Sequence, residues 1–446
     1  MTKSPLNLTK IAFAFILIYS FFINHPAKAI SIERVKSSVG IEAWLVRDHT
    51  NPIISVRFAF RGGSALDPKN LGGLANMTAS LLDEGAGKFN SKTFQGTLED
   101  LVISLRFNAQ LDALGGRLVT LVENRNSAFK LLKLALTKPR FDQEPVERIR
   151  SQILSSIRQN TENPSAIASK SLFKKLFPNH PYGKSQSGTE TSIAAITRKD
   201  LITFTKNRLA KNNLIIGVVG DITSESLKTT LDNVFGDLPV EATPWKVPEA
   251  IPKSDGFTLV IKKNIPQSSI VFADIGLKRS HPDFYAAYLM NYILGGGGFT
   301  SRLYNTIREK RGLAYSVYSG LYPLKHSGLL IGGAGTNNSK VSETLHLLRK
   351  EWARMANKGV TQQELTDAKT YQTGSYPLRF GSSSSIAAML VSIQMDNLGI
   401  NYINQRNKLI EDVNLNTVNR IAKTLIRPNS LNIVVVGKPK GLKSTP

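Results

Sequence analysis

Residues 196–221 read ITRKDLITFTKNRLAKNNLIIGVVGD, and residues 413–438 repeat the same layout as VNLNTVNRIAKTLIRPNSLNIVVVGK. Apolar and glycine positions of the two stretches correspond at a constant offset of 217: Leu201 with Val418, Phe204 with Ile421, and Gly220 with Gly437. Each copy predicts a helix followed by a continuous apolar strand that ends at glycine, which is typical of a strand buried on both faces. The repeat therefore predicts two copies of one structural unit.

The same offset also holds further upstream. Glu147 in PVERIRSQI lies 217 residues before Glu364 in QELTDAKTY. We therefore expect two homologous domains, at residues 31–237 and 256–440. The stretch between them, residues 238–255, contains four prolines and is expected to be an extended, semi-rigid linker.

Each predicted domain opens with strands of alternating polarity. In PIISVRFAFRGG, the apolar side chains Ile54, Val56, Phe58 and Phe60 share one face. Helical segments, a further pair of strands and two or more helices follow before the closing strand. Hairpin-like pairs mixed with helical blocks favour an α+β fold with helices on one side of each sheet.

The N-terminal 29 residues have the order of a secretory signal peptide. They lack acidic side chains and place Lys3 and Lys10 before the apolar run IAFAFILIYSFFI, and an A-x-A site ends at Ala29. We expect residues 1–29 to be a signal peptide cleaved near Ala29, which predicts an exported protein. The alternative is a retained anchor, although 13 apolar residues are few for a membrane span. No later apolar stretch is long enough to span a bilayer.

The composition is strongly basic and lacks cysteine. The chain has 57 Lys and Arg against 33 Asp and Glu, a formal net charge of +24. Such an excess could attract nucleic acid, anionic lipid headgroups or acidic peptides. The basic residues are spread along the chain without interleaved stacking aromatics, so we expect no nucleic-acid partner. A solvated basic surface is the simplest interpretation, and without disulfides the cores alone must stabilise the fold.

Motifs for independent catalysis are missing from the sequence. No two histidines beyond the leader lie three to five residues apart, so zinc would need single ligands from distant segments. The chain has no cysteine and no GxSxG nucleophile motif. The run GGGGFTSRLY, residues 295–304, lacks the GK[ST] ending of a phosphate loop. Its glycines favour a pliable lip or a close approach of another backbone.

The segment after these glycines contains an arginine and a tyrosine seven residues apart. SRLYNTIREKRG predicts a basic helix from about Ser301 to Gly312, and LAYSVYSG predicts a strand. Arg308 could interact with the negative end of the helix while Tyr315 packs at the sheet edge. Alternatively, both side chains could donate hydrogen bonds to the carbonyls of an extended peptide. The spacing alone favours the structural role.

The stretch FRGGSALDPKNLGGLANMTASLLDEG resembles the first active-site segment of the insulinase and pitrilysin metallopeptidases, which include the mitochondrial processing peptidase. In that family a helix carries H-x-x-E-H, whose histidines bind zinc and whose glutamate activates water, and a later glutamate completes the site. The resemblance implies two homologous α+β domains of the processing-peptidase (LuxS/MPP-like metallohydrolase) type. Each would have a mostly antiparallel sheet with helices packed on it.

This sequence departs from the motif at every functional position. The two histidines correspond to Asn76 and Ser80, the catalytic glutamate to Ala79, and the later glutamate to Ser156. An amide and hydroxyls do not replace the strongly donating ligands on which tight zinc binding depends. The resemblance therefore implies that this chain has no catalytic residue and holds no metal, and that its helix keeps only a structural role.

The C-terminal half matches the family's pattern at its functional positions, whereas the first half does not. HPDFYAAYLMNYILGGGGFTSRLYNTIREKRGLAYSVYSG resembles the family's C-terminal domain, in which an arginine and a tyrosine contact the bound peptide; they correspond to Arg308 and Tyr315. The whole is similar to the non-catalytic, substrate-binding subunit of a two-chain peptidase. It implies peptide substrates and a homologous partner with H-x-x-E-H that carries the zinc, in the bacterial periplasm. The alternatives are a peptide-binding or scaffold module without proteolysis, and an independent enzyme using other residues.

Overall fold

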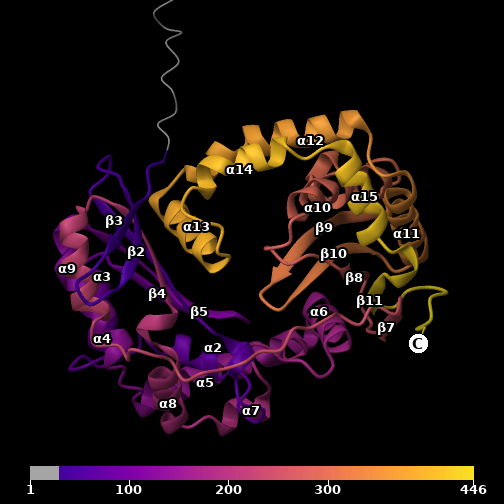
Figure 1. Cartoon of the computed structure of the whole chain (residues 1–446). Helices are drawn as coiled ribbons and strands as arrows, with labels where there is room; N and C mark the ends of the chain where they lie inside the picture. The colour runs from indigo at the N-terminus through magenta and orange to yellow at the C-terminus, as the bar shows by residue number, and fades with distance from the viewer. Residues whose placement is uncertain (1–29, 446) are drawn as a thin grey trace, which may run out of the picture. The chain divides into compact units, whose positions relative to one another are not determined.

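The computed structural model describes residues 30–445, so the expected signal peptide at residues 1–29 lies outside the described residues. Each half of the chain contributes one β-sheet (Figure 1). The N-terminal sheet contains β1 (Glu33–Lys36), β2 (Glu42–Arg47), β3 (Ile53–Arg61), β4 (Ser104–Ala109), β5 (Ala113–Leu121) and β6 (Leu214–Gly220). The C-terminal sheet contains β7 (Thr258–Lys262), β8 (Gln267–Ile275), β9 (Ala314–Leu324), β10 (Ser327–Asn337) and β11 (Asn432–Gly437).

The two sheets have the same topology. The strand orders are β1-β2-β6-β3-β5-β4 and β7-β11-β8-β10-β9, which match position by position once β1 is set aside. The pairs β2–β6 and β7–β11 are parallel and the other pairs of these sheets are antiparallel. The mostly antiparallel sheets confirm the predicted α+β fold. The central strands β6 and β11 are the apolar runs of the sequence repeat.

Helices separate the strands in the same order in both halves. The N-terminal half contains α2 (Leu74–Ala79), α3 (Ser91–Asp100), α4 (Arg125–Thr137), α5 (Gln143–Glu162), α6 (Pro164–Leu176), α7 (Glu190–Ala195), α8 (Arg198–Arg208) and α9 (Ser224–Phe235). The C-terminal half contains α10 (Phe284–Asn291), α11 (Val341–Lys358), α12 (Gln362–Gly374), α13 (Ser383–Met395), α14 (Tyr402–Glu411) and α15 (Leu415–Leu425). The first residues of α8 and α15 are 217 positions apart in the sequence, and so are their last residues, as the repeat predicts. No helix within residues 30–445 is long and apolar enough to cross a membrane.

Each half buries one face of its sheet under its own helices. In the N-terminal half, the predicted apolar face of β3 is buried in a core that includes Leu201 and Phe204 of α8. In the C-terminal half, Phe272 of β8 meets Trp352 of α11 edge to face, with ring centres 5.6 Å apart. These two cores supply the apolar burial on which a chain without disulfides depends.

The opposite face of each sheet receives a helix from the other half of the chain (Figure 1). Val391 of α13 packs on Ala59 and Ile215 of the N-terminal sheet. In return, α6 lies against β8 and β11, where Leu172 is part of the same apolar cluster as Val434. The sequence predicted helices on one side only, because the pattern within one half carries no signal for packing against the other.

A glycine and an arginine hold α13 in this position. A Cβ atom on Gly217 of β6 would lie 2.8 Å from the carbonyl oxygen of Ala387, so only glycine permits this close approach. Arg61 of β3 donates hydrogen bonds of 2.8 Å to the carbonyl oxygens of both Gln394 and Met395 at the C-terminal end of α13. Orphan carbonyls at a helix C-terminus are thus satisfied from the other half of the chain.

Candidate functional site

The segment that resembles the family's active-site helix forms α2, a short helix whose N-terminal end is held by hydrogen bonds. Gly73, at a φ of 93°, precedes α2 in the left-handed conformation. The carboxylate of Asp67 accepts hydrogen bonds from the backbone N–H groups of Gly73 at 2.8 Å and Ala75 at 3.0 Å. Burial raises the pKa of Asp67 to about 7, while these hydrogen bonds oppose the shift. Leu74 and Met77 enter the N-terminal core, so α2 supports the fold.

The four positions that correspond to zinc ligands and base carry no metal-binding chemistry. Asn76 on α2 and Ser80 directly after it are half-buried, Ala79 is buried, and Ser156 is exposed on α5, which α2 contacts. The Ser80 hydroxyl donates a hydrogen bond of 3.0 Å to the backbone carbonyl of Asn76. Within residues 30–445, no three His, Asp or Glu side chains lie together as a metal site would require. An amide, a methyl group and two hydroxyls do not fit a zinc ion.

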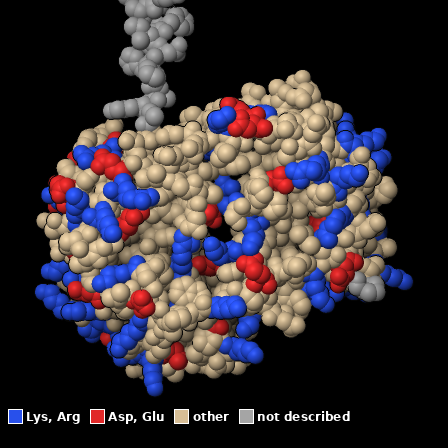
Figure 2. Space-filling model, viewed as in Figure 1, with Lys and Arg blue, Asp and Glu red and all other residues tan. Residues whose placement is uncertain are grey.

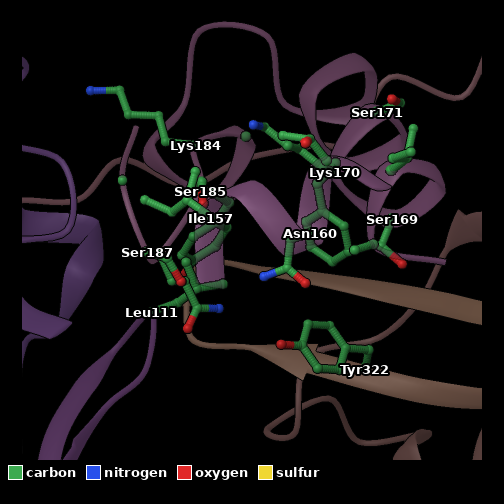
Figure 3. Close-up of a pocket in the computed structure, with 18 residues that line it drawn as sticks. Leu111, Ile157, Asn160, Ser169, Lys170, Ser171, Lys184, Ser185, Ser187 and Tyr322 are labelled. Carbon is green, nitrogen blue, oxygen red and sulfur yellow. The ribbon is translucent and has the colours of Figure 1, made fainter. Parts of the chain in front are cut away.

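A cavity of about 630 Å³ opens beside α5 and α6 (Figure 3). Its wall includes Ile157, which follows Ser156, and Tyr322 of β9. Its lining mixes apolar side chains such as Phe173 with polar ones, among them Asn160 and the two cations Lys170 and Lys184. Such a mixed wall suits a ligand that has both apolar and hydrogen-bonding groups.

A second cavity, of about 620 Å³, adjoins the first. The two share Leu111, Gln186 and Tyr322 in their walls. The second extends along the turn between β4 and β5 to Asp396 beyond α13, and Arg57 and Lys325 also line it. We call the two cavities together the chamber. Basic side chains are scattered over the face in Figure 2 and also surround the hollow at its middle.

Arg308 and Tyr315 lie together in the C-terminal half. Arg308 belongs to η7 (Tyr304–Glu309), a π-helical turn in the segment predicted to be a basic helix. Its guanidinium carbon lies 5.5 Å from the ring centre of Tyr315, 4.7 Å from that of Tyr304 and 5.9 Å from that of Phe299. Such distances permit cation–π attraction with each ring. Three aromatic rings therefore position this guanidinium.

Two of the three rings around the Arg308 guanidinium are largely exposed to solvent. Tyr315 is 82% exposed and Phe299 is 76% exposed, so neither ring is buried at the sheet edge. The hydrogen bonds and ion pairs of the described residues include none from the Arg308 guanidinium. Its donors are thus free for a ligand. Sequence reasoning missed Phe299 and Tyr304, although the four-residue spacing from Tyr304 to Arg308 is a signal that two side chains meet on a helix.

A buried ion pair fixes the segment between the glycine run and η7. Arg302 donates hydrogen bonds to Glu364 of α12, from Nε at 2.7 Å and from Nη2 at 2.6 Å. Within the glycine run, a Cβ atom on Gly295 would lie 2.7 Å from the backbone nitrogen of Ser319, which confirms the predicted close approach of another backbone. Only the last glycine of the run, Gly298 at a φ of 57°, has open space where a Cβ atom would lie, whereas Gly296 and Gly297 are closely packed.

The structure keeps the two predicted groups of site residues apart. The cavity in Figure 3 reaches the residue after Ser156, but its lining contains neither Arg308 nor Tyr315. The four degenerate positions belong to the N-terminal half and the arginine–tyrosine pair to the C-terminal half.

Comparison with known proteins identifies the family of the chain. A family model described as "Insulinase (Peptidase family M16)" matches residues 43–190, and one described as "Peptidase M16 inactive domain" matches residues 195–371. The chain belongs to peptidase family M16. The predicted resemblance to the insulinase and pitrilysin peptidases is thereby confirmed.

Relatives within family M16 cover nearly the whole chain. A Helicobacter pylori protein called "Non-peptidase homolog YmxG" is 29% identical over 433 residues, 96% of this chain and 99% of that protein. A Bacillus subtilis protein called "Uncharacterized zinc protease YmxG" is 24% identical over 362 residues, 79% of this chain and 86% of that protein. A solved M16 inactive-domain structure from Pseudomonas fluorescens has a TM-score of 0.87 and 28% identity, and covers 93% of this chain and 99% of that chain.

These matches place both groups of site residues in the M16 framework. Asn76, Ala79, Ser80 and Ser156 fall within the residues matched by the insulinase model. Arg308 and Tyr315 fall within the residues matched by the inactive-domain model. The chain thus has the M16 architecture, and the four positions in its first half hold Asn, Ala, Ser and Ser.

Proposed function

We propose that this chain is the non-catalytic, substrate-binding subunit of an exported, periplasmic heteromeric zinc metallopeptidase that acts on peptides. One combination carries the proposal. The four zinc-site positions hold residues without metal-binding chemistry, whereas the Arg308 guanidinium has no hydrogen-bond or ion-pair partner among residues 30–445 and lies beside an exposed Tyr315. The name of the Helicobacter relative, a non-peptidase homologue, agrees with an inactive chain.

Two edge strands give the proposed peptide a backbone to pair with. Within residues 30–445, β4 pairs only with β5, and β9 pairs only with β10. An extended peptide can add to such an edge through main-chain hydrogen bonds. The chamber lies along the β4–β5 turn, and Tyr322 of β9 lines it. Side chains of a peptide bound at either edge would therefore lie next to the chamber.

The chemistry of cleavage belongs to a second chain in this proposal. A homologous partner with intact H-x-x-E-H would hold the zinc and activate the water. The residues of this chain then bind and orient the peptide, through the donors of Arg308 and the hydroxyl of Tyr315. The signal-like residues 1–29 support export of this chain, and the proposal requires the partner to be exported as well.

The test is reconstitution with an exported homologue that contains H-x-x-E-H. We expect the purified chain to carry no stoichiometric zinc by elemental analysis and to cleave no peptide alone, but to raise peptide cleavage when mixed with the partner. One tightly bound zinc per isolated chain would overturn the proposal. Peptide binding without any gain in cleavage would instead support the alternative of a peptide-binding or scaffold module.

Arg308→Ala tests the arginine–tyrosine pair directly. We expect kcat/KM of the reconstituted pair to fall by about tenfold or more, because a charged hydrogen bond to substrate is lost. The thermal midpoint should change little, since two of the three rings that the guanidinium contacts, Phe299 and Tyr315, are exposed and the guanidinium forms no ion pair with the described residues. Lys310→Ala is the matched control, because Lys310 is exposed in the same segment and carries the same charge. Equal activity of both variants would assign Arg308 a structural role.

A further inference from the structure

A third cavity, of about 220 Å³, lies between α10, α13, α14 and the short helix η8 (Tyr376–Phe380). Three arginines line it: Arg279, Arg379 and Arg406. They come from three different segments of the C-terminal half, and no sequence motif connects them. A concave site that gathers three guanidinium groups is a candidate for binding an anion.

The two less exposed arginines have only neutral partners. Arg406, which is 4% exposed, donates hydrogen bonds to the backbone carbonyl oxygen and the side-chain oxygen of Gln372 and to the side-chain oxygen of Asn407. Its guanidinium carbon lies 4.4 Å from the ring centre of Tyr376. Arg279 donates to the hydroxyl groups of Tyr285 at 2.9 Å and Tyr402 at 2.8 Å. Within residues 30–445, none of the three cavity arginines forms an ion pair. The Nη1 and Nε donors of Arg279 form no hydrogen bond with these residues.

The partners of Arg406 differ from those of Arg302, which is also a buried arginine. Arg302, at 8% exposed, has a carboxylate partner with two hydrogen bonds. Buried charges in proteins are normally paired, because an unpaired one loses its hydration without compensation. The positive charge of Arg406 is therefore incompletely compensated by its own surroundings, and an anionic ligand would supply the missing partner.

One carboxylate also lines the cavity. Asp396 lies at the end of α13, and burial raises its pKa, while Arg279, Lys325 and Arg61 oppose the shift. A single carboxylate leaves an excess of positive charge among the lining groups even when it is ionised. Two of the lining hydroxyls, those of Tyr376 and Tyr285, stay neutral, since burial raises the pKa of Tyr376 to about 12 and also raises that of Tyr285.

The cavity adjoins the chamber and has apolar walls. Its lining shares Ser392 and Asp396 with the second chamber cavity. Phe284, Met389 and Leu398 contribute apolar surface. Its volume is several times the roughly 30 Å³ that one water molecule takes in the liquid, so a bare anion would leave it largely empty. An anionic group attached to an apolar side chain fits better.

We propose that this cavity binds the C-terminal residue of a peptide lying in the chamber, with Arg279 and Arg379 holding its free carboxylate and Arg406 supplying positive charge behind them. The inference rests on the proposed peptide-binding function and adds a substrate class to it, peptides with a free C-terminus. Bidentate hydrogen bonds between guanidinium and carboxylate supply both affinity and orientation.

The test compares a free acid with its amide. N-acetyl-phenylalanine and N-acetyl-phenylalaninamide are titrated into the full chain by calorimetry, and so are two decapeptides that differ only in a free or amidated C-terminus. We expect the acid to bind at least about tenfold more tightly than the amide in both pairs, as for a hydrogen bond to a charged group. Arg379→Gln and Arg279→Gln should each reduce that ratio to less than about threefold.

Lys408→Gln is the matched control, because this cation on α14 is exposed, pairs with Asp412 and does not line the cavity. The acid-to-amide ratio should be unchanged in this variant. Equal binding of acid and amide would overturn the inference, and so would binding of inorganic phosphate without N-acetyl-phenylalanine. If the reconstituted pair still cleaves amidated peptides as well as free acids, the inference fails while the proposed function stands. Acid-selective binding without any cleavage gain would uphold the cavity and reject the proposed function.

Discussion

The pair formed by Arg302 and Glu364 allows the energetic effect of one buried contact to be predicted. Arg302→Met keeps the length of the side chain and removes its charge and its hydrogen bonds to Glu364 and to the carbonyl oxygen of Gly359. Loss of one partner from a buried ion pair costs about 3–5 kcal/mol. Glu364 remains 28% exposed at its side chain and still accepts a hydrogen bond from the backbone of Thr361, so we expect the lower end, about 3 kcal/mol.

Urea unfolding followed by circular dichroism measures this loss. Lys408→Met is the control, because Lys408 and Asp412 form an exposed pair, with side chains 77% and 57% exposed, for which we expect less than about 1 kcal/mol. Arg302→Met combined with Glu364→Met should be more stable than Arg302→Met alone, since the second change removes the uncompensated carboxylate. A loss below about 1 kcal/mol for Arg302→Met would refute the reasoning.

The pH dependence of the same variant gives an independent check. Burial alone would raise the pKa of Glu364, but the hydrogen bonds and charge of Arg302 lower it below its usual value. A carboxylate with a lowered pKa in the folded chain stabilises it above the unfolded pKa of about 4, and this stabilisation is lost as the pH falls through the folded pKa. The difference between wild type and Arg302→Met should therefore shrink below about pH 4. A difference that stays constant from pH 7 to pH 3 would contradict this assignment.

Two further changes test the first site segment. The triple variant Asn76→His, Ala79→Glu and Ser80→His should not become an efficient peptidase, because Ser156 still supplies no carboxylate; robust chelator-sensitive cleavage would show that the fourth ligand has been assigned wrongly. Asp67→Asn should change how stability depends on pH: the pKa of Asp67 is raised to about 7, so wild type should lose up to about 4 kcal/mol relative to the variant as the pH rises from about 4 to 7. Parallel unfolding curves of wild type and Asp67→Asn across that range would argue against the raised pKa.

The sequence predicted the parts of the fold that depend on local pattern. The repeat at offset 217 identified β6 and β11, and the alternation in β3 identified the buried face. The absence of an H-x-x-E-H motif from α2 could also be read from the sequence, because such a motif depends on residue identity at fixed spacing.

Contacts between distant segments could not be predicted in this way. The close approach of α13 to Gly217 joins residues about 170 positions apart, and a glycine within a strand does not show which segment approaches it. The cavity arginines share no spacing, so only the folded chain brings Arg279 and Arg406 together. The rings around Arg308 lay within reach of sequence reasoning, since Tyr304 is four residues away.

The reciprocal packing of α6 and α13 has a consequence for how such a molecule arises. Each sheet is covered on one face by a helix of the other half, so one copy of the repeated unit alone would leave that face uncovered. A single-copy ancestor could satisfy both faces by exchanging that helix with an identical molecule, as domain-swapped dimers do. Joining the two genes would then have turned a symmetric dimer into one chain, free to lose a catalytic site from one half while the other kept its own role.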